Sequence, residues 1–306
     1  MGLIDWVSQR AAGLTTGLAT GLGKNLADSG HTAVYLRQLL RGNRAPAAAE
    51  RVRPPSPLAA GPLAVGPQAA GPGRPVLLIN GYLANRGSLH LLERRLHQRQ
   101  HLVLSYRLPR LNVGDIRDSA ALIARKVESL VAQTSVPSID IVGHSMGGLV
   151  GLYYVKRLGG RRRVRRLILL GTPAAGTWSA LLGLVTAPFG MASLQLLPSS
   201  PFLRELNETP LPPGVDVVSV GGERDYFAPL STTVLDGIRH VALPTGHSGL
   251  LVDEAVATAL DELLRAPVAG DPTAAEQPLP STPRTPAAPS APAATGATVW
   301  ATGRRK

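Results

Sequence analysis

The sequence predicts an α/β protein with a mostly parallel central sheet and helices on both faces of that sheet. Short apolar runs alternate with segments of helical apolar spacing between residues 74 and 266, a pattern typical of parallel sheets with right-handed crossovers. Several runs are almost continuously apolar, as strands covered on both faces are. In "DIVGHSMGG" (140–148), glycines surround a serine where an apolar run passes into a helical pattern. Functional side chains in such sheets lie at the carboxyl ends of the strands.

The period of the apolar residues predicts the individual elements. Six segments have the length and composition of strands: 75–80, 101–108, 138–143, 166–171, 215–221 and 238–243. Four segments with helical spacing lie between or after them: 87–100, 115–134, 146–158 and 247–265.

Two segments rich in proline, alanine and glycine flank the predicted domain, residues 74–266. Residues 46–73 and 267–306 lack apolar periodicity, so we expect a linker and a disordered tail. Residues 1–45 carry apolar side chains three or four positions apart. This spacing predicts an N-terminal helical segment, which we expect to dock against the domain.

The N-terminal segment has too short an uncharged stretch to cross a bilayer. Thirteen uncharged residues separate Arg10 from Lys24, whereas a transmembrane helix needs about 20. The segment also lacks the apolar core and the cleavage site of a clear signal peptide. We therefore expect a protein that is cytoplasmic or peripherally associated with a membrane.

The amino-acid composition limits the classes of molecule that we expect the protein to bind. The 32 Lys and Arg residues against 20 Asp and Glu give a net charge of +12, which favours anionic partners. Five arginines cluster within 161–166, which we interpret as a solvated loop before a strand. Aromatic residues make up 4% of the chain, too few to form a base-stacking surface, so we expect no nucleic-acid partner. Without cysteine, and without a cluster of His, Asp and Glu at ligand spacing, we expect no metal and no cofactor.

The serine between the glycines is the candidate nucleophile. Gly143, Ser145 and Gly147 form a Gly-x-Ser-x-Gly sequence at a predicted strand-to-helix turn. A turn of this kind, the nucleophile elbow, holds its serine at positive φ and exposes the hydroxyl oxygen. The following helix points its N-terminus at the reacting centre and favours negative charge there.

A serine hydroxyl needs a base and an orienting acid. Of seven histidines, His247 lies on a glycine-flanked loop just after the last strand, whereas His144 adjoins the nucleophile and faces elsewhere. The acid should follow another strand, between serine and histidine in the chain. Asp225 meets this condition, and Glu223 is the nearest alternative.

The oxyanion of an acyl-transfer reaction needs two backbone N–H donors. The first should be Met146, directly after the nucleophile. The second should come from the loop after the first strand, "LLINGYLAN" (77–85), which places Tyr82 there.

These residues resemble the α/β hydrolases, and most closely the compact bacterial lipases and esterases of the triacylglycerol lipase type. The family's oxyanion loop, its "HSMGG" elbow, its "GTP" turn and its terminal "GH-x-GLL" all have counterparts between Pro75 and Leu264. One departure is Asn80, which stands where the family has a histidine before the oxyanion-loop glycine.

Residues 174–213 form a long apolar insertion relative to the smallest lipases. Prolines and glycines divide it into short helical stretches. Two interpretations are open: a small packed cap, or a mobile lid that shields an acyl-chain pocket.

The expected function is that of a serine hydrolase that cleaves carboxylic esters through an acyl-enzyme, as a lipase or esterase does. Its substrate would be a small-molecule or lipid ester. Two alternatives remain: a thioesterase or acyltransferase with the same triad, and a catalytically weak relative that binds lipid or a partner.

Overall fold

The computed structural model describes residues 29–40, 42, 74–106, 112–134, 136–189 and 191–268. A six-stranded sheet in the order β2-β1-β3-β4-β5-β6 runs through this part of the chain, and every neighbouring pair of strands is parallel. The prediction of an α/β fold is confirmed. The strands are β1 (Val76–Ile79), β2 (Val103–Tyr106), β3 (Ile139–His144), β4 (Val164–Leu170), β5 (Asp216–Gly222) and β6 (Arg239–Leu243).

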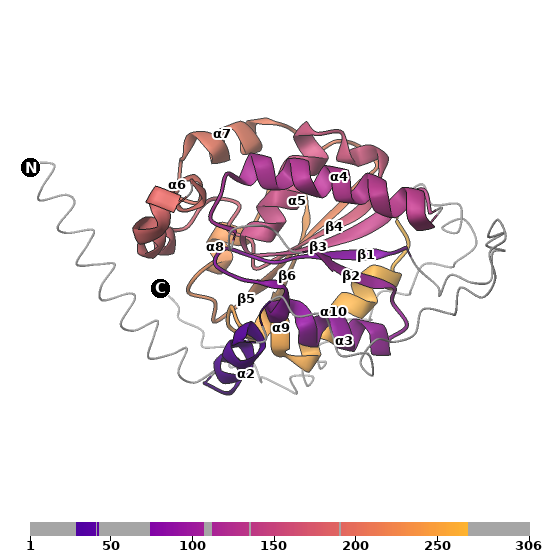
Figure 1. Cartoon of the computed structure of the whole chain (residues 1–306), viewed down its shortest axis with the longest axis horizontal. Coiled ribbons are helices and arrows are strands. Elements are labelled where there is room, and N and C mark those ends of the chain that lie inside the picture. Colours follow the sequence, from indigo (N-terminus) through magenta and orange to yellow (C-terminus); the bar gives the residue numbers. More distant parts are fainter. Residues whose placement is uncertain are drawn as a thin grey trace, which may run out of the picture.

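Helices cover both faces of the sheet (Figure 1). One face carries α4 (Ile116–Thr134) and α5 (Met146–Arg157), and the other carries α3 (His90–Gln98) and α10 (Glu254–Arg265). Shorter elements connect them: η1 (Arg86–Leu89), η3 (Gly160–Arg162), η4 (Trp178–Phe189), α6 (Ala192–Gln195), α7 (Pro201–Glu208), α8 (Leu230–Thr233) and α9 (Gly249–Val252).

Apolar side chains of the strands contribute to two separate hydrophobic cores, one on each face of the sheet. Side chains alternate along a strand, so Leu77 and Ile79 pack beneath α4 and α5. Val76 and Leu78, on the same strand, pack against α3 and α10. All four side chains are buried, which explains why this strand shows no polar alternation in the sequence.

Two helices differ from their predicted extents. The last helix, expected over 247–265, is divided into α9 and α10 at Asp253. Asp253 has an extended backbone, and its carboxylate accepts the N–H of Ala255 at 2.9 Å. It therefore ends one helix and caps the next. The helix expected over 87–100 begins with the 3-10 turn η1 and becomes α-helical at His90.

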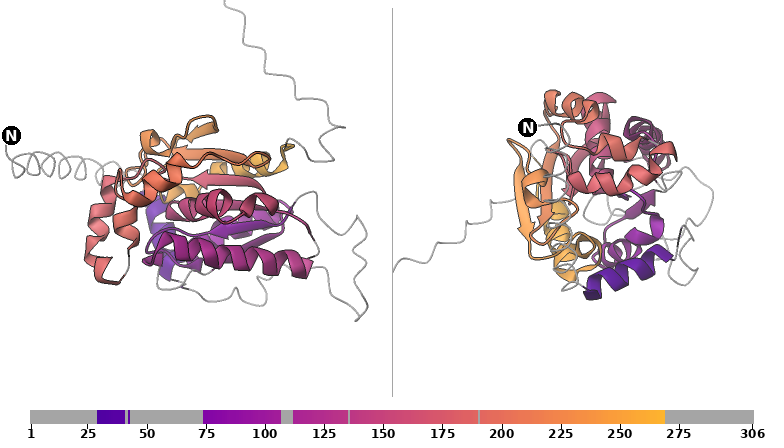
Figure 2. Two further views of the ribbon diagram at one scale, coloured as in Figure 1. Left: turned by 90° about the horizontal axis from the view of Figure 1, so that it is seen from above. Right: turned by 90° about the vertical axis from the view of Figure 1, so that its left-hand side faces the viewer.

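The insertion at 174–213 contains η4, α6 and α7, and its second half is a packed cap. Leu196, Phe202 and Leu206 are buried in the same core as α4 and α5. The side-chain oxygen of Gln195 accepts the N–H of Ile116 at 2.8 Å. Figure 2 shows helical segments of the insertion extending beyond one end of the layer formed by α4 and α5. In η4, by contrast, Trp178 and Leu182 are exposed.

The described part of the N-terminal segment is helix α2 (Ser29–Leu40). It lies against η1 and α9. The Asn85 amide donates to the Leu39 carbonyl at 2.9 Å. Near the start of α2, His31 Nε2 lies 3.8 Å from Asp253 Oδ2. Residues 1–28, the expected linker at 46–73 and the expected tail beyond Val268 lie outside the described residues. No helix of the described part is long and apolar enough to cross a membrane.

The arginine cluster is not one solvated loop, so that interpretation was wrong in part. Arg161 and Arg162 are exposed, but Arg166 lies within β4 and is 1% exposed. Its guanidinium pairs with Asp216 on β5 at 2.7 Å and donates to the carbonyls of Leu263 and Ala266. A buried cation is tolerated because these acceptors replace water.

We predict that Arg166→Met lowers the free energy of unfolding by about 3 kcal/mol, because it leaves Asp216 and two buried carbonyls without their donor. Denaturant unfolding measures this difference. The matched control is Arg165→Met on the same strand. The half-buried Arg165 makes no ion pair within the described residues, so its replacement should change stability by less than about 0.5 kcal/mol. Equal losses from the two variants would contradict the assignment.

Candidate active site

Ser145 occupies a strained turn between β3 and α5. It is the N-cap of α5, and its φ of 54° and ψ of −126° lie in a region that non-glycine residues rarely adopt. Its N–H donates to the Leu170 carbonyl of β4 at 2.8 Å. Such a conformation costs on the order of 1–3 kcal/mol and persists only where surrounding structure imposes it.

The glycines around Ser145 impose that conformation by allowing close backbone approach. A Cβ on Gly143 would lie 2.5 Å from the Gly147 carbonyl oxygen, and one on Gly147 would lie 2.4 Å from the Ile79 oxygen. A Cβ on Gly148 would lie 1.9 Å from Thr172 Oγ1. The first turn of α5 therefore packs directly on β1 and on the turn after β4, which leaves the Ser145 side chain as the one that can project from the elbow.

His247 and Asp225 form a hydrogen-bonded pair on the loops after β6 and β5. His247 Nδ1 lies 2.6 Å from Asp225 Oδ2, and the Asp225 side chain is fully buried. The other carboxylate oxygen accepts the N–H groups of Phe227 and Ala228 at 2.9 and 2.8 Å. An ionised carboxylate only accepts, so Nδ1 carries the proton and the lone pair of a neutral His247 is on Nε2.

The ring of His144, the residue before Ser145 in the chain, lies against His247 of this pair. Its ring centroid lies 4.6 Å from that of His247, and its Nε2 donates to the His247 carbonyl at 3.3 Å. Complete burial, and then the neighbouring His247, lower the pKa of His144 well below its usual value. A neutral His144 thus fixes the His247 loop next to Ser145. Adjacency to the nucleophile was the only sequence signal for this role.

Gly171, at the end of β4, leaves room for the Asp225–His247 pair. Its φ is +58°, and a Cβ there would lie 3.2 Å from Asp225 Oδ2 and 3.5 Å from His247 Nδ1. The turns after β3 and β4 and the loops after β5 and β6 therefore meet at one edge of the sheet, as the sequence predicted.

The loop after β1 closes over the serine. A Cβ on Gly81 would lie 2.8 Å from Ser145 Cβ and 3.4 Å from its Oγ, so this loop passes directly over the Ser145 side chain. Tyr82 follows Gly81, and its hydroxyl donates to the Gly183 carbonyl of η4 at 3.0 Å. Met146, the other expected donor, is buried at the start of α5.

Two buried asparagines lie at this loop, and Asn80 is the one that the sequence analysis singled out. Asn80 is 1% exposed, and neither polar atom of its side chain has a hydrogen-bond partner within the described structure. The Asn112 amide donates to the Gly81 carbonyl at 2.6 Å. Asn112 lies just before α4, and no motif drew attention to it.

Large apolar side chains are exposed beside His247, on the loop after β1 and on the insertion. Phe227 covers the His247 ring at a centroid distance of 5.5 Å, and its carbonyl accepts the hydroxyls of Thr177 and Ser179 at the start of the insertion. Six large apolar residues of the site loops and the insertion are more than a third exposed: Leu83, Trp178, Leu182, Met191, Leu194 and Phe227. We call these six residues the apolar rim.

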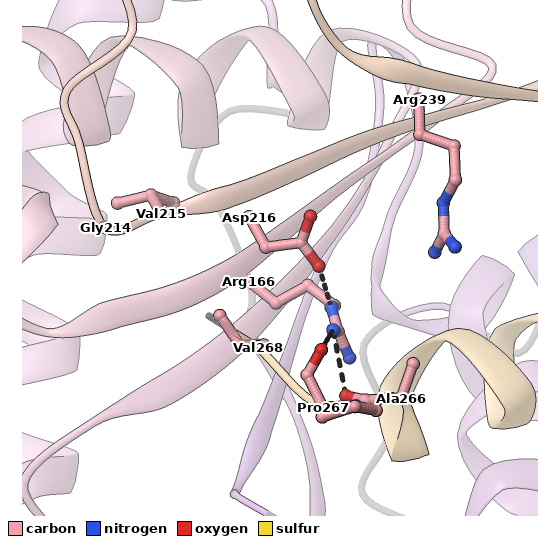
Figure 3. Close-up of a pocket in the computed structure, with 8 residues that line it drawn as sticks. All are labelled: Arg166, Gly214, Val215, Asp216, Arg239, Ala266, Pro267 and Val268. Atoms are coloured by element: carbon pink, nitrogen blue, oxygen red, sulfur yellow. Dashed lines mark hydrogen bonds and ion pairs between the residues drawn. The ribbon is translucent and has the colours of Figure 1, made fainter. Parts of the chain in front are cut away.

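The opposite end of the sheet holds a cavity of about 380 Å³ that is lined by Arg166, Asp216 and Arg239 among others. Its main polar groups already bond one another, since the Arg166 guanidinium lies between Asp216 and the carbonyls of the C-terminal segment (Figure 3). No group of three or more His, Cys, Asp or Glu residues able to hold a metal occurs among the described residues.

Comparisons with known proteins agree with this architecture. A family model described as "alpha/beta hydrolase fold" matches residues 74–204. The mature form of Bacillus licheniformis lipase BlEst2 is similar at 16% identity, over 63% of this chain and 92% of that chain, with a TM-score of 0.55. Aspergillus fumigatus lipase B is similar at 17% identity, over 76% of this chain and 65% of that chain, with a TM-score of 0.54. The expected resemblance to α/β hydrolases is confirmed.

We predict that Gly148→Ala destabilises the fold by about 3 kcal/mol, since the new methyl would overlap the stiff, β-branched Thr172. Gly151→Ala on the same helix is the matched control. Its methyl would meet only the flexible end of Leu167 at 2.9 Å, and alanine favours a helix over glycine by about 1 kcal/mol. Thermal and denaturant unfolding of both variants test the prediction. It is wrong if Gly148→Ala is as stable as the control.

Proposed function

We propose that this chain, which has the α/β-hydrolase fold, is a serine hydrolase that cleaves carboxylic esters through an acyl-enzyme. Ser145 is the nucleophile, His247 the general base and Asp225 the orienting acid. The observation that carries the proposal is the 2.6 Å bond between His247 Nδ1 and Asp225 Oδ2 at the edge of the sheet where Ser145 occupies its strained turn.

The first half-reaction acylates the enzyme. His247 Nε2 accepts the hydroxyl proton as Ser145 Oγ attacks the carbonyl carbon of the ester, and Asp225 stabilises the resulting imidazolium. The backbone N–H groups of Tyr82 and Met146 donate to the tetrahedral oxyanion. When the intermediate collapses, the C–O bond to the leaving group breaks and His247 returns the proton to the departing alcohol.

The second half-reaction releases the acid. Water gives a proton to His247 and attacks the acyl carbon, and the second tetrahedral intermediate expels Ser145, which regains its proton from the imidazolium. The chemistry needs only this chain's own groups and water.

The apolar rim supports a substrate with an apolar acyl group, whether a small-molecule ester or a lipid ester. Apolar side chains that stay exposed on several neighbouring loops are typical of a surface that meets an apolar ligand. A thioesterase or acyltransferase would use the same acylation step and differ in the leaving group or the acceptor. The unpartnered Asn80 amide favours a catalytically weak binding relative as the second candidate, because a poorly supported oxyanion loop lowers turnover.

We predict that a fluorophosphonate labels one residue, Ser145, because surface serines have neither a base nor an oxyanion hole. Ser145→Ala should abolish both labelling and hydrolysis of p-nitrophenyl esters and leave the thermal unfolding temperature nearly unchanged. His247→Ala should slow both reactions by several orders of magnitude. Mass spectrometry locates the adduct. A folded wild-type protein that takes no label would reject the hydrolase proposal in favour of the binding relative.

We further predict that kcat/KM falls with unit slope on the acid side, because the proposed base, His247, accepts the serine proton only in its neutral form. The slope is one because the proposed base must be neutral, whereas His144, whose pKa burial lowers, is neutral throughout. A series of p-nitrophenyl ester assays from pH 5 to pH 8 measures the slope. A slope of two would show that His144 also titrates, and a flat profile would remove histidine from the mechanism.

A further inference from the structure

We propose that Asn112 is a positioning residue that orients the peptide bond between Gly81 and Tyr82, so that the Tyr82 N–H points at the oxyanion. This inference rests on the proposed function. It gives the oxyanion loop a support that the Asn80 side chain does not supply.

The geometry joins Asn112 to the relevant peptide unit. Its side-chain amide donates to the Gly81 carbonyl at 2.6 Å and lies 3.4 Å from the Asn80 carbonyl. The Gly81 carbonyl and the Tyr82 N–H belong to one planar peptide group and point in opposite directions. A donor that holds the carbonyl on one side therefore sets the direction of the N–H on the other.

The same bond strengthens the donor as well as orienting it. A hydrogen bond to a peptide carbonyl polarises the peptide group and makes its N–H a better donor, most of all where water is excluded. Asn112 is 1% exposed, so its bond does not compete with water. Gly81, which has no side chain, lets the loop approach Ser145 closely enough for this N–H to be used.

Asn112 is itself held in place by the cap. Its φ of 58° is left-handed, a conformation that asparagine tolerates better than most residues. Just after it, the Val113 carbonyl accepts the N–H of Ala192 at 3.1 Å, and Gln195 bonds both the Ile116 N–H and the Asp115 carboxylate at 2.8 Å. The packed half of the insertion thus fixes the segment that holds the oxyanion loop.

Asn80 has a different relation to the loop. Its side chain is buried beside the same peptide, yet it donates to nothing and accepts nothing within the described residues. Asn80 stands where the similar hydrolases have a histidine. In this structure the Asn112 amide, and not the Asn80 side chain, bonds the loop.

The test compares Asn112→Gly and Asn112→Asp with the wild type. Glycine accepts the left-handed backbone and removes the amide alone, whereas aspartate keeps the shape and replaces the donor by an acceptor. We expect kcat to fall about 10- to 100-fold, less than the ~100- to 1000-fold loss of a whole oxyanion donor. KM should change by less than about threefold, since the oxyanion forms after substrate binds.

Two measurements separate positioning from a purely structural role. Rates are expressed per site that a fluorophosphonate finally labels, so that unfolded protein does not count. Affinity for a trifluoromethyl ketone, which forms a tetrahedral adduct with the serine, should fall in parallel with kcat/KM. Asn85→Ala is the control, because that amide bonds the Leu39 carbonyl at the far end of the same loop and should leave both values unchanged.

The outcomes are distinct. If the folded wild type neither turns over nor labels, the proposed function and this inference both fail. If the wild type is active and the Asn112 variants keep its kcat per labelled site, the inference alone fails. If the variants lose labelled sites and melting temperature but the remaining sites turn over normally, Asn112 is structural and the inference is likewise overturned.

Discussion

The close packing of the first turn of α5 against β1 and β4 is the constraint on which the proposed site depends. At Gly143 and Gly147 a Cβ would lie within 2.5 Å of a backbone oxygen, a separation that no side chain tolerates. With the helix packed this close to the sheet, the chain reverses direction at one residue, and Ser145 takes its strained conformation at positive φ. The strain is thereby supported by the two hydrophobic cores, whose burial holds strand and helix together. Gly81 can then pass over the serine, and His144 can reach the His247 loop.

Much of this arrangement was predictable because it follows from local periodicity and chain order. Several of the six strands show almost continuous apolar runs, and Ser145, Asp225 and His247 each follow a strand. Parallel strands bring their carboxyl ends to one edge, so placing Asp225 and His247 after strands was enough to predict that they lie close together, at 2.6 Å. The division of the last helix at Asp253 was missed because its apolar spacing continues across the break, while a single N-cap bond ends the helix there.

The remaining features depend on contacts between distant segments, which a single sequence does not display. Asn112 precedes α4 and meets Gly81 across 31 positions, and nothing in its neighbourhood marks it as part of the loop. Arg166 belongs to a run of arginines whose other members are partly or fully exposed, and alternation along β4 alone decides that its side chain is buried. The difference between the buried and exposed parts of the insertion also depends on contacts between distant segments. Its apolar residues look alike in the sequence, but those after Met191 include Leu196 and Phe202, which join the main core, whereas Trp178 and Leu182 face solvent.

The amino ends of the strands carry stabilising ion pairs, whereas the carboxyl ends carry the residues of the proposed site. At the amino ends lie two ion pairs: Arg166 with Asp216 joins β4 to β5, and Arg74 with Asp140, at 2.8 Å, joins the residues before β1 to β3. Burial raises the pKa of Asp140 although Arg74 opposes that change, so loss of Arg74 would leave a buried carboxyl without its counter-ion. At the carboxyl ends the polar groups serve a geometry that includes a strained serine and an asparagine with unpartnered atoms. The two hydrophobic cores hold the strands and helices together and so support the strain at this end. We therefore expect substitutions of the ion-paired residues at the amino ends to change stability before activity, whereas loss of the Asn112 amide should change activity before stability.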